Sequence, residues 1–183
     1  MTPRTSLSHP LRIDAVEPGP GLGRIGLSFC PGKYQPDAMT GAWARDLATD
    51  LDAIARWGAK AVVTLVEAHE LRALRVEHMG EAVAATGMRW FHLPIRDVTA
   101  PGAAFEAEWA SVGPELHAIL RGGGNVFVLC KGGLGRAGTV AARLLVELGW
   151  EPEAAIRAVR AARPGAIEVL AQERYVRALG AAA

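Results

Sequence analysis

One short stretch, residues 125–139, constrains the fold of this chain more than any other. It begins with an apolar run, Val126 to Leu129, whose length and β-branched or aromatic side chains are typical of an interior parallel strand. Residues 140–148 then show the three- and four-residue spacing of apolar side chains that predicts a helix. Between them, Cys130 and Arg136 enclose five residues, three of which are glycine. The sequence therefore predicts a strand, a glycine-rich loop and a helix in succession.

The glycine-rich loop is suited to binding a dianion such as phosphate. Consecutive backbone N–H groups in such a turn can point into one concavity, and the first turn of the following helix adds its free N–H groups and the positive end of its dipole. The planar fork of Arg136 could hold two phosphate oxygens at once, which a lysine could not. Cys130 lies in the same field and should be stabilised as a nucleophilic thiolate. We interpret the loop as a phosphate site with a built-in nucleophile.

Two other glycine-rich motifs overlap this loop, and the surrounding sequence disfavours both. Residues 133–138 fit the Gly-x-Gly-x-x-Gly pattern of dinucleotide-binding sites. Helical sequence at residues 151–162, however, stands where a second strand with an acidic residue for the ribose would be needed. Residues 133–139 also have the outline of a nucleotide-binding P-loop, but they lack its lysine. The context therefore favours the interpretation based on Cys130 and Arg136.

The loop and two flanking motifs resemble a known family. The Cys-x5-Arg motif of Cys130 and Arg136 is similar to the phosphate loop of the cysteine-based protein tyrosine and dual-specificity phosphatases. Residues 93–97 (Leu-Pro-Ile-Arg-Asp) and residues 163–168 (Arg-Pro-Gly-Ala-Ile-Glu), with Gln172, resemble the kinase-associated phosphatase branch, which acts on cyclin-dependent kinases in animals. The likeness extends over residues 23–179. A Cys-x5-Arg motif alone would be a weak signal, whereas three motifs in the family's order are specific.

The resemblance implies a two-step hydrolysis of phosphate monoesters without a metal or another cofactor. Cys130 would attack phosphorus, Asp97 would act as general acid and then as general base, and water would release the phosphocysteine. Asp97 follows a predicted strand and is the only carboxylate between Met88 and Pro101. Gln172 could help to position water as an accessory residue, although packing is the simpler role for it. The phosphate-binding set would be Lys131, Gly132, Gly133, Leu134, Gly135 and Arg136.

Apolar patterning along the chain predicts an α/β fold with a mostly parallel central sheet of four to five strands. Helices would cover both faces, and the site would lie at the carboxyl ends of the strands. In the helix predicted over residues 42–57, Trp43 would share one face with Leu47, Leu51 and Ile54. The other strands are predicted at residues 24–29, 61–66 and 88–95, and the other main helices at residues 105–120, 153–162 and 167–179.

The length of 183 residues favours one domain. Residues 1–22 are rich in proline, serine and glycine, and we expect a flexible N-terminal arm with an edge strand within residues 11–16. Residues 23–183 would then form a single phosphatase-like domain.

Composition and charge disfavour several classes of partner and location. A net charge of +1 predicts no general attraction to nucleic acid or to an anionic membrane. The sequence has no apolar run long enough to cross a bilayer, and its first ten residues lack the apolar core of a signal peptide. Two cysteines cannot form a disulfide framework, so a cytoplasmic location is the simplest expectation. Cys30 is interpreted as a core residue, with a redox partner of Cys130 as the alternative.

Two positions depart from the family pattern. Leu129 stands where the family usually has a histidine that orders the loop, and Ala137 stands where it usually has a hydroxyl group that assists the departing sulfur. These departures predict slow breakdown of the phosphocysteine. They also keep open a second class of function, a catalytically weakened phosphate-binding module that recognises phosphorylated partners. The presence of Cys130, Arg136 and Asp97 together favours the enzyme.

The expected substrate is a phosphorylated protein or a small phosphate ester. Phosphotyrosine is the first candidate, with phosphoserine and phosphothreonine as alternatives. No clear counterpart of the loop that deepens the pocket of tyrosine-specific enzymes is present, which favours a shallower, dual-specificity site. Lys131 matches the first lysine in the loop of the tensin-related phosphoinositide phosphatases, but Leu134 replaces their second, which makes phosphoinositides less favoured. Nucleotide and RNA phosphates stay open as substrates.

Overall fold

A five-stranded sheet forms the centre of the computed structural model, which describes residues 2–180. The strand order is β1-β2-β7-β5-β6. Strands β2, β7, β5 and β6 run parallel to one another, and β1 joins the edge antiparallel to β2. The α/β class and the mostly parallel sheet are therefore confirmed. The strands are β1 Asp14–Val16, β2 Ile25–Ser28, β5 Ala59–Thr64, β6 Arg89–His92 and β7 Asn125–Leu129.

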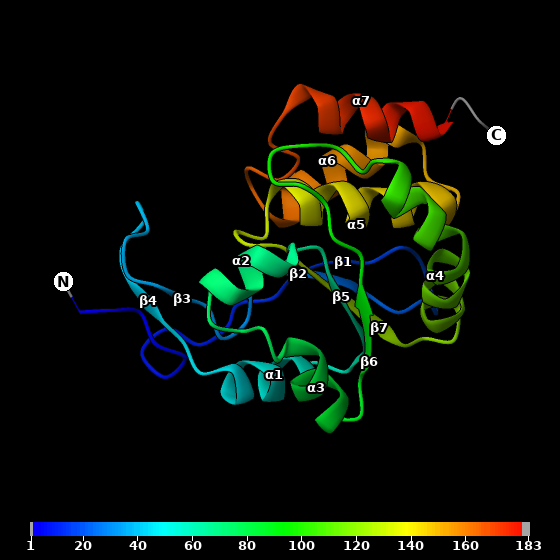
Figure 1. The fold of residues 1–183 in the computed structure, drawn as a ribbon. Helices are drawn as coiled ribbons and strands as arrows, with labels where there is room; N and C mark the ends of the chain where they lie inside the picture. Colours follow the sequence, from blue (N-terminus) through cyan, green and yellow to red (C-terminus); the bar gives the residue numbers. More distant parts are fainter. Residues whose placement is uncertain (1, 181–183) are drawn as a thin grey trace.

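Helices cover both faces of the sheet, as the patterning predicts. In Figure 1, α5, α6 and α7 lie above the sheet, and α1 and α3 lie below it. The upper layer comprises α5 Gly135–Glu147, α6 Pro152–Ala162 and α7 Leu170–Leu179. Helix α4, Ala103–Arg121, packs on the same side of the sheet. The lower layer comprises α1 Leu47–Arg56, α2 Ala68–Ala73 and α3 Met79–Ala85.

Strand β7 contributes to the core on both sides, which explains its unbroken apolar sequence. Val126 and Val128 pack into the cluster formed with α4 to α7. Phe127 and Leu129 pack into the cluster formed with α1 to α3. Successive side chains of a strand point to opposite faces, and helices cover both faces of this sheet, so all four side chains are fully buried. The central position of β7 fixes where the following loop leaves the sheet.

The helix predicted over residues 42–57 is wrong at its start. Residues Trp43–Ala44 form β4, which pairs with β3, Tyr34–Gln35, in a separate two-stranded sheet. Helix α1 begins only at Leu47, because the Asp46 side chain accepts a hydrogen bond from the Thr49 N–H and caps the helix. Helical spacing places Trp43 on the face of Leu47, but the cap at Asp46 starts the helix after Trp43.

The amino-terminal residues contact the rest of the protein at several points. The predicted edge strand within residues 11–16 is confirmed as β1. Ser6 is buried and accepts a hydrogen bond from the Asp46 N–H through its hydroxyl, at 3.0 Å. The Pro18 carbonyl accepts a hydrogen bond from the Trp150 indole N–H at 2.9 Å. The division between an arm of residues 1–22 and a domain of residues 23–183 stays a prediction.

Candidate active site

The loop between β7 and α5 opens into a pocket of about 360 Å³ at the carboxyl end of the sheet. Four segments that are distant in sequence meet there: the loop itself, the loop after β6, the segment after β2 and the turn before residue 170. The first three follow parallel strands, so their side chains converge where such folds form their sites. The lining includes Cys130, Lys131, Gly132, Leu134, Arg136, Asp97, Glu168 and Lys33.

The conformation of the loop depends on glycine at residue 133. Gly133 has a φ of +72°, and a side chain there would place its Cβ 2.2 Å from the Ser28 carbonyl carbon. The loop therefore passes too close to β2 for any other residue. Arg163 holds the outer side of the same turn, because its guanidinium donates to the Gly133 carbonyl at 2.5 Å and to the Gly132 carbonyl at 3.0 Å. Arg163 thus holds these two carbonyl oxygens on the outer side of the turn, which leaves N–H groups of the loop on the side of the pocket.

Cys130 lies at the floor of the pocket with its side chain nearly buried, at 3% exposed. Its Sγ accepts a hydrogen bond from the Gly133 N–H at 3.2 Å. Helix α5 begins at Gly135, so its amino-terminal end faces the same region. An N–H donor and a helix amino terminus both favour a negative charge on sulfur.

The two departures from the family pattern have clear structural settings. Leu129 is fully buried in the cluster under α1 to α3, so an apolar side chain fits its position. Ala137 is fully buried in the first turn of α5. The nearby hydroxyl of Thr139 donates to the Gly135 carbonyl at 2.7 Å, which is a bond within the helix. Thr139 therefore does not offer its hydroxyl in place of the one missing at Ala137.

Arg136 is held by a buried carboxylate that the sequence interpretation missed. Its guanidinium is 2% exposed and donates two hydrogen bonds to Glu70, at 2.7 and 3.0 Å. A third bond goes to the Ile95 carbonyl at 2.9 Å. Asp97 also approaches the guanidinium, with an oxygen 3.2 Å from Nη2, the nitrogen that donates the 3.0 Å bond to Glu70. These bonds fix the plane of the guanidinium before any phosphate arrives.

The Glu70–Arg136 pair keeps both partners charged. Burial alone would raise the pKa of Glu70, but hydrogen bonds from Arg136 and from the Glu67 N–H outweigh it and leave that pKa below its ordinary value. Burial would likewise lower the pKa of Arg136, yet the bonds with Glu70 and the adjacent Cys130 raise it. The pairing spans 66 positions of sequence, and only the fold shows it.

Asp97 is placed on an exposed loop at the mouth of the pocket. Its side chain is 56% exposed and accepts a hydrogen bond from the Val98 N–H at 3.0 Å. Val98 has a φ of +59°, in the left-handed region that a β-branched residue rarely adopts. The turn that presents Asp97 to Arg136 is therefore strained at its next residue.

Gln172 supports the loop of Asp97 and lies outside the pocket lining. Its amide is fully buried, and its Oε1 accepts the Glu168 N–H at 2.9 Å. Its Nε2 donates to the Thr99 carbonyl at 3.2 Å, two residues beyond Asp97. Both ends of the amide are thus bound to backbone. This arrangement fits a packing role, and the expected accessory role with water stays a prediction.

Cys30 is fully buried, as expected for a core residue. Its N–H donates to the Lys131 carbonyl at 3.3 Å, so it lies beside the phosphate loop. Burial raises the pKa of its thiol to about 12, although the nearby Lys33 opposes that change. Both Cys30 and Cys130 are free thiols in the structure. A redox partnership between them stays a prediction.

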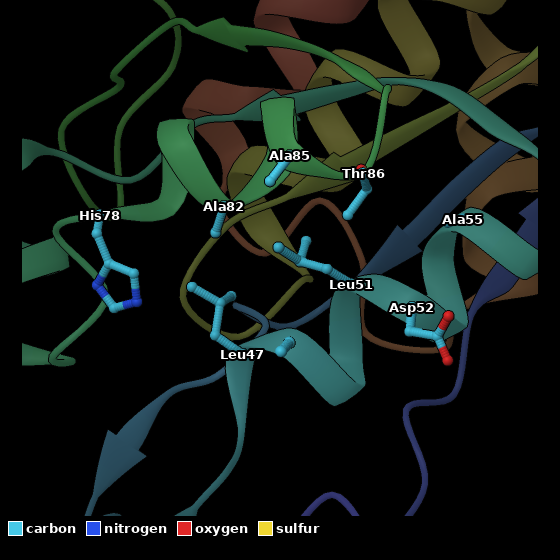
Figure 2. Close-up of a pocket in the computed structure, with 9 residues that line it drawn as sticks. Leu47, Leu51, Asp52, Ala55, His78, Ala82, Ala85 and Thr86 are labelled. Atoms are coloured by element: carbon cyan, nitrogen blue, oxygen red, sulfur yellow. The ribbon is translucent and has the colours of Figure 1, made fainter.

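A second hollow, of about 500 Å³, lies between α1 and α3 and has a different character. Figure 2 shows Leu47, Leu51, Ala82 and Ala85 lining its middle, with His78 at one end and Asp52 towards the other. None of the predicted catalytic residues lines it, and it contains no lysine or arginine. Cys130, Arg136 and Asp97 line the other pocket instead. Within residues 2–180, three or more His, Cys, Asp or Glu side chains are nowhere grouped as metal ligands, and the helices there are too short or too polar to cross a membrane.

Comparison with known proteins agrees with this geometry. A family model described as "Polymorphic toxin system, DSP-PTPase phosphatase" (Tc-R-P) matches residues 38–150. Cyclin-dependent kinase inhibitor 3 of Sus scrofa is 30% identical over 155 residues, which cover 83% of this chain and 69% of that protein. The family-model match spans the strand, loop and helix that hold Cys130 and Arg136, and the match to the relative covers most of the chain.

Solved structures show the same similarity over nearly the whole chain. Kinase associated phosphatase, crystallised with serine in place of its catalytic-site cysteine, has a TM-score of 0.81 and 27% identity over 96% of this chain and 98% of that one. Tk-PTP in its active form has a TM-score of 0.69 and 29% identity, covering 92% and 97%. The chain therefore belongs to the cysteine-based dual-specificity phosphatases, within their kinase-associated phosphatase-like branch.

Proposed function

We propose that this chain hydrolyses phosphate monoesters through a phosphocysteine on Cys130, without a metal. The observation that carries the proposal is the convergence of Cys130, Arg136 and Asp97 on one pocket, with Arg136 and Asp97 only 3.2 Å apart. A site that only bound phosphate would need neither a nucleophile nor an acid.

In the first step, the Cys130 sulfur forms a bond to phosphorus while the bond from phosphorus to the leaving oxygen breaks. Asp97, in its protonated form, donates its proton to that oxygen, and the product alcohol or phenol leaves. Arg136 and the N–H groups of residues 131–136 hold the three remaining phosphate oxygens, where negative charge must be stabilised during transfer.

In the second step, water attacks the phosphocysteine and the phosphorus–sulfur bond breaks. Asp97, now a carboxylate, accepts a proton from the water, and Cys130 departs as a thiolate with inorganic phosphate as the other product. The Gly133 N–H, 3.2 Å from sulfur, supports the departing thiolate. Ala137 supplies no hydroxyl for this purpose, which makes the second step the slower one in the proposal.

The proposed substrate is a phosphorylated protein, with phosphotyrosine first and phosphoserine or phosphothreonine as alternatives. One relative is named a kinase associated phosphatase and another a cyclin-dependent kinase inhibitor, so a phosphorylated kinase is a candidate protein substrate. The sequence has no clear counterpart of the loop that deepens the pocket of tyrosine-specific enzymes, which supports dual specificity. A reducing, cytoplasmic location is part of the proposal, because the nucleophile must stay a free thiol.

Hydrolysis of para-nitrophenyl phosphate, in a reducing buffer with a metal chelator, tests this function. We expect turnover by the unaltered chain, none by Cys130→Ser, and losses of about tenfold or more in Asp97→Asn and Arg136→Lys. Cys30→Ser is the matched control, because it removes the other thiol of the chain and should keep turnover.

Two results would contradict the enzymatic proposal. Turnover that survives in Cys130→Ser would assign the chemistry to another nucleophile. No turnover by the unaltered chain, together with tungstate binding that disappears in Arg136→Lys, would support the phosphate-binding module instead.

A further inference from the structure

One wall of the pocket carries a buried lysine that the mechanism does not use. Lys33 follows β2, is only 6% exposed and lines the pocket together with Cys130. Its ammonium nitrogen lies 4.7 Å from the centre of the Phe29 ring and 4.4 Å from that of Trp43. Within residues 2–180, the ammonium group makes one hydrogen bond. It is a long one, 3.5 Å, to the carbonyl of Lys131, the residue after the nucleophile. Lys33 therefore presents a positive charge next to the backbone of the residue that follows Cys130.

Lys33 has no anionic partner. Among residues 2–180, no carboxylate oxygen lies within 4.0 Å of its nitrogen. Arg45 packs against the same two rings, and the contrast is informative, because Arg45 forms two hydrogen bonds of 2.8 Å with the buried Asp50. The aromatic faces attract the Lys33 ammonium but do not neutralise it. Among residues 2–180, Arg45 is paired with a carboxylate, whereas Lys33 has only the thiols of Cys30 and Cys130 nearby to offset its charge.

The backbone around Lys33 is held firmly in place. The Gly32 N–H donates to Asp50 at 2.8 Å, and the Arg45 N–H donates to the Lys33 carbonyl at 3.2 Å. Gly32 has a φ of +70°, and a Cβ there would collide with Leu47. The side chain is thus aimed by buried bonds and close packing. Such support is typical of a side chain that binds a ligand.

The position of Lys33 is unfavourable for the folded protein by itself. Its pKa falls to about 8, chiefly because burial disfavours the charged form, and the charges of Arg45 and Lys131 add to this effect. Perturbed, poorly compensated groups of this kind concentrate in functional sites. An anion bound beside Lys33 would relieve the penalty.

We infer that Lys33 binds a second anionic group of the substrate, next to the phosphate held by Arg136. The inference rests on the proposed function and specifies its substrate class: phosphate monoesters that carry another phosphate or a carboxylate close to the first. The hydrogen bond from the Lys33 ammonium to the carbonyl of Lys131, which follows Cys130 in sequence, places this charge beside the phosphate site. Of the other charged residues of the lining, Lys131 is cationic and would also attract an anion, whereas Asp97 and Glu168 are acidic and would repel one on their side.

The test uses phosphotyrosine peptides that differ only at the two residues flanking the phosphotyrosine. These flanks are alanine, glutamate or phosphoserine, and kcat/KM is measured for each peptide. The variants are Lys33→Met, which keeps the apolar part of the side chain, and Lys60→Met, a matched control at the exposed second residue of β5. Lys33→Gln provides a second variant should Lys33→Met fold poorly.

We expect the unaltered chain and Lys60→Met to favour at least one acidic flank over alanine by roughly tenfold. The preference should disappear in Lys33→Met and Lys33→Gln. Preference for phosphoserine alone identifies a second phosphate as the ligand, and equal preference for glutamate identifies any anion. The absence of a preference, or an equal loss on all peptides in both Lys33 variants, would overturn the inference.

Failure of the inference can be separated from failure of the proposed function. Fluorescence anisotropy with Cys130→Ser measures binding of the same peptides without turnover. Acidic flanks should tighten that binding roughly tenfold, and adding Lys33→Gln to Cys130→Ser should remove the effect. If no peptide is hydrolysed by the unaltered chain but this difference is present, the function is wrong and the anion site stands.

Discussion

The Glu70 carboxylate holds the Arg136 guanidinium through two hydrogen bonds, of 2.7 and 3.0 Å, so the arginine that we propose to bind phosphate is oriented before substrate arrives. Both side chains are buried, and Glu70 comes from α2 while Arg136 comes from α5. Binding energy that would otherwise be used to order the arginine is then available to stabilise the transferring phosphoryl group.

Glu70→Gln should lower kcat/KM on an aryl phosphate by about one to two powers of ten. The amide cannot accept both charged hydrogen bonds, each worth roughly 1.5–3 kcal/mol. Glu67→Gln is the control, because Glu67 is a carboxylate of the same segment with no bond to Arg136. Equal activity of Glu70→Gln and the unaltered chain would show that the orientation of Arg136 does not limit catalysis.

The same pair should make stability depend on pH in acid. The pKa of folded Glu70 lies below its ordinary value of 4.5, so the pair stabilises the folded state above that pH and loses this effect as pH falls through the folded pKa. The difference in unfolding free energy between the unaltered chain and Glu70→Gln should be largest above about pH 5. Urea unfolding from pH 3 to 7 measures it, and a difference that grows towards pH 3 would refute the assignment.

Lys33→Met should stabilise the folded protein at neutral pH. The pKa of Lys33 falls from 10.5 to about 8 on folding, so the unfolded state binds the proton more tightly, and the charged amine destabilises the fold below pH 8. A shift of this size corresponds to at most about 3 kcal/mol. The advantage of Lys33→Met should shrink as pH rises from 8 to 10.5. The amine faces Cys30, Arg45, Lys131 and Cys130, and all four are also present in Lys60→Met. The same pH series on Lys60→Met therefore shows the part of the pH dependence that does not come from Lys33.

Ala137→Ser should accelerate turnover by about one to two powers of ten. A hydroxyl at this buried position of α5 would donate to the departing Cys130 thiolate, and such a bond to a charged group is worth roughly 1.5–3 kcal/mol. The control is Thr139→Ser, whose hydroxyl should stay bound to the Gly135 carbonyl. Turnover that is no faster in Ala137→Ser would show that release of the thiolate is not slow.

Val98→Asn should raise the unfolding free energy by about 1 kcal/mol. Val98 has a φ of +59°, which asparagine tolerates far better than a β-branched residue. Val98→Ala is the matched control, because it removes the exposed side chain but retains most of the backbone penalty. If both variants change stability equally, the exposed valine side chain, rather than the backbone, is responsible.

The class of fold and the succession of strand, glycine-rich loop and helix could be predicted because their determinants are local. The apolar run of β7, the glycines and the spacing of Cys130 and Arg136 all lie within fifteen residues of sequence. The start of α1 could not be predicted from periodicity, because the Asp46 cap overrides the helical spacing that includes Trp43. The contacts of Glu70 and Lys33 could not be predicted from the sequence. Glu70 bonds to Arg136 and Lys33 bonds to the Lys131 carbonyl, and each pair is brought together only by the fold.

Trapping of the phosphoenzyme tests the central claim most directly. The protein is mixed with excess aryl phosphate, quenched in acid after milliseconds to seconds, digested and examined by mass spectrometry. We predict a phosphate on the peptide that contains Cys130, formed in a burst, depleted more quickly in Ala137→Ser and absent from Cys130→Ser. Turnover without any phosphate on Cys130, or with phosphate on another residue, would contradict the account.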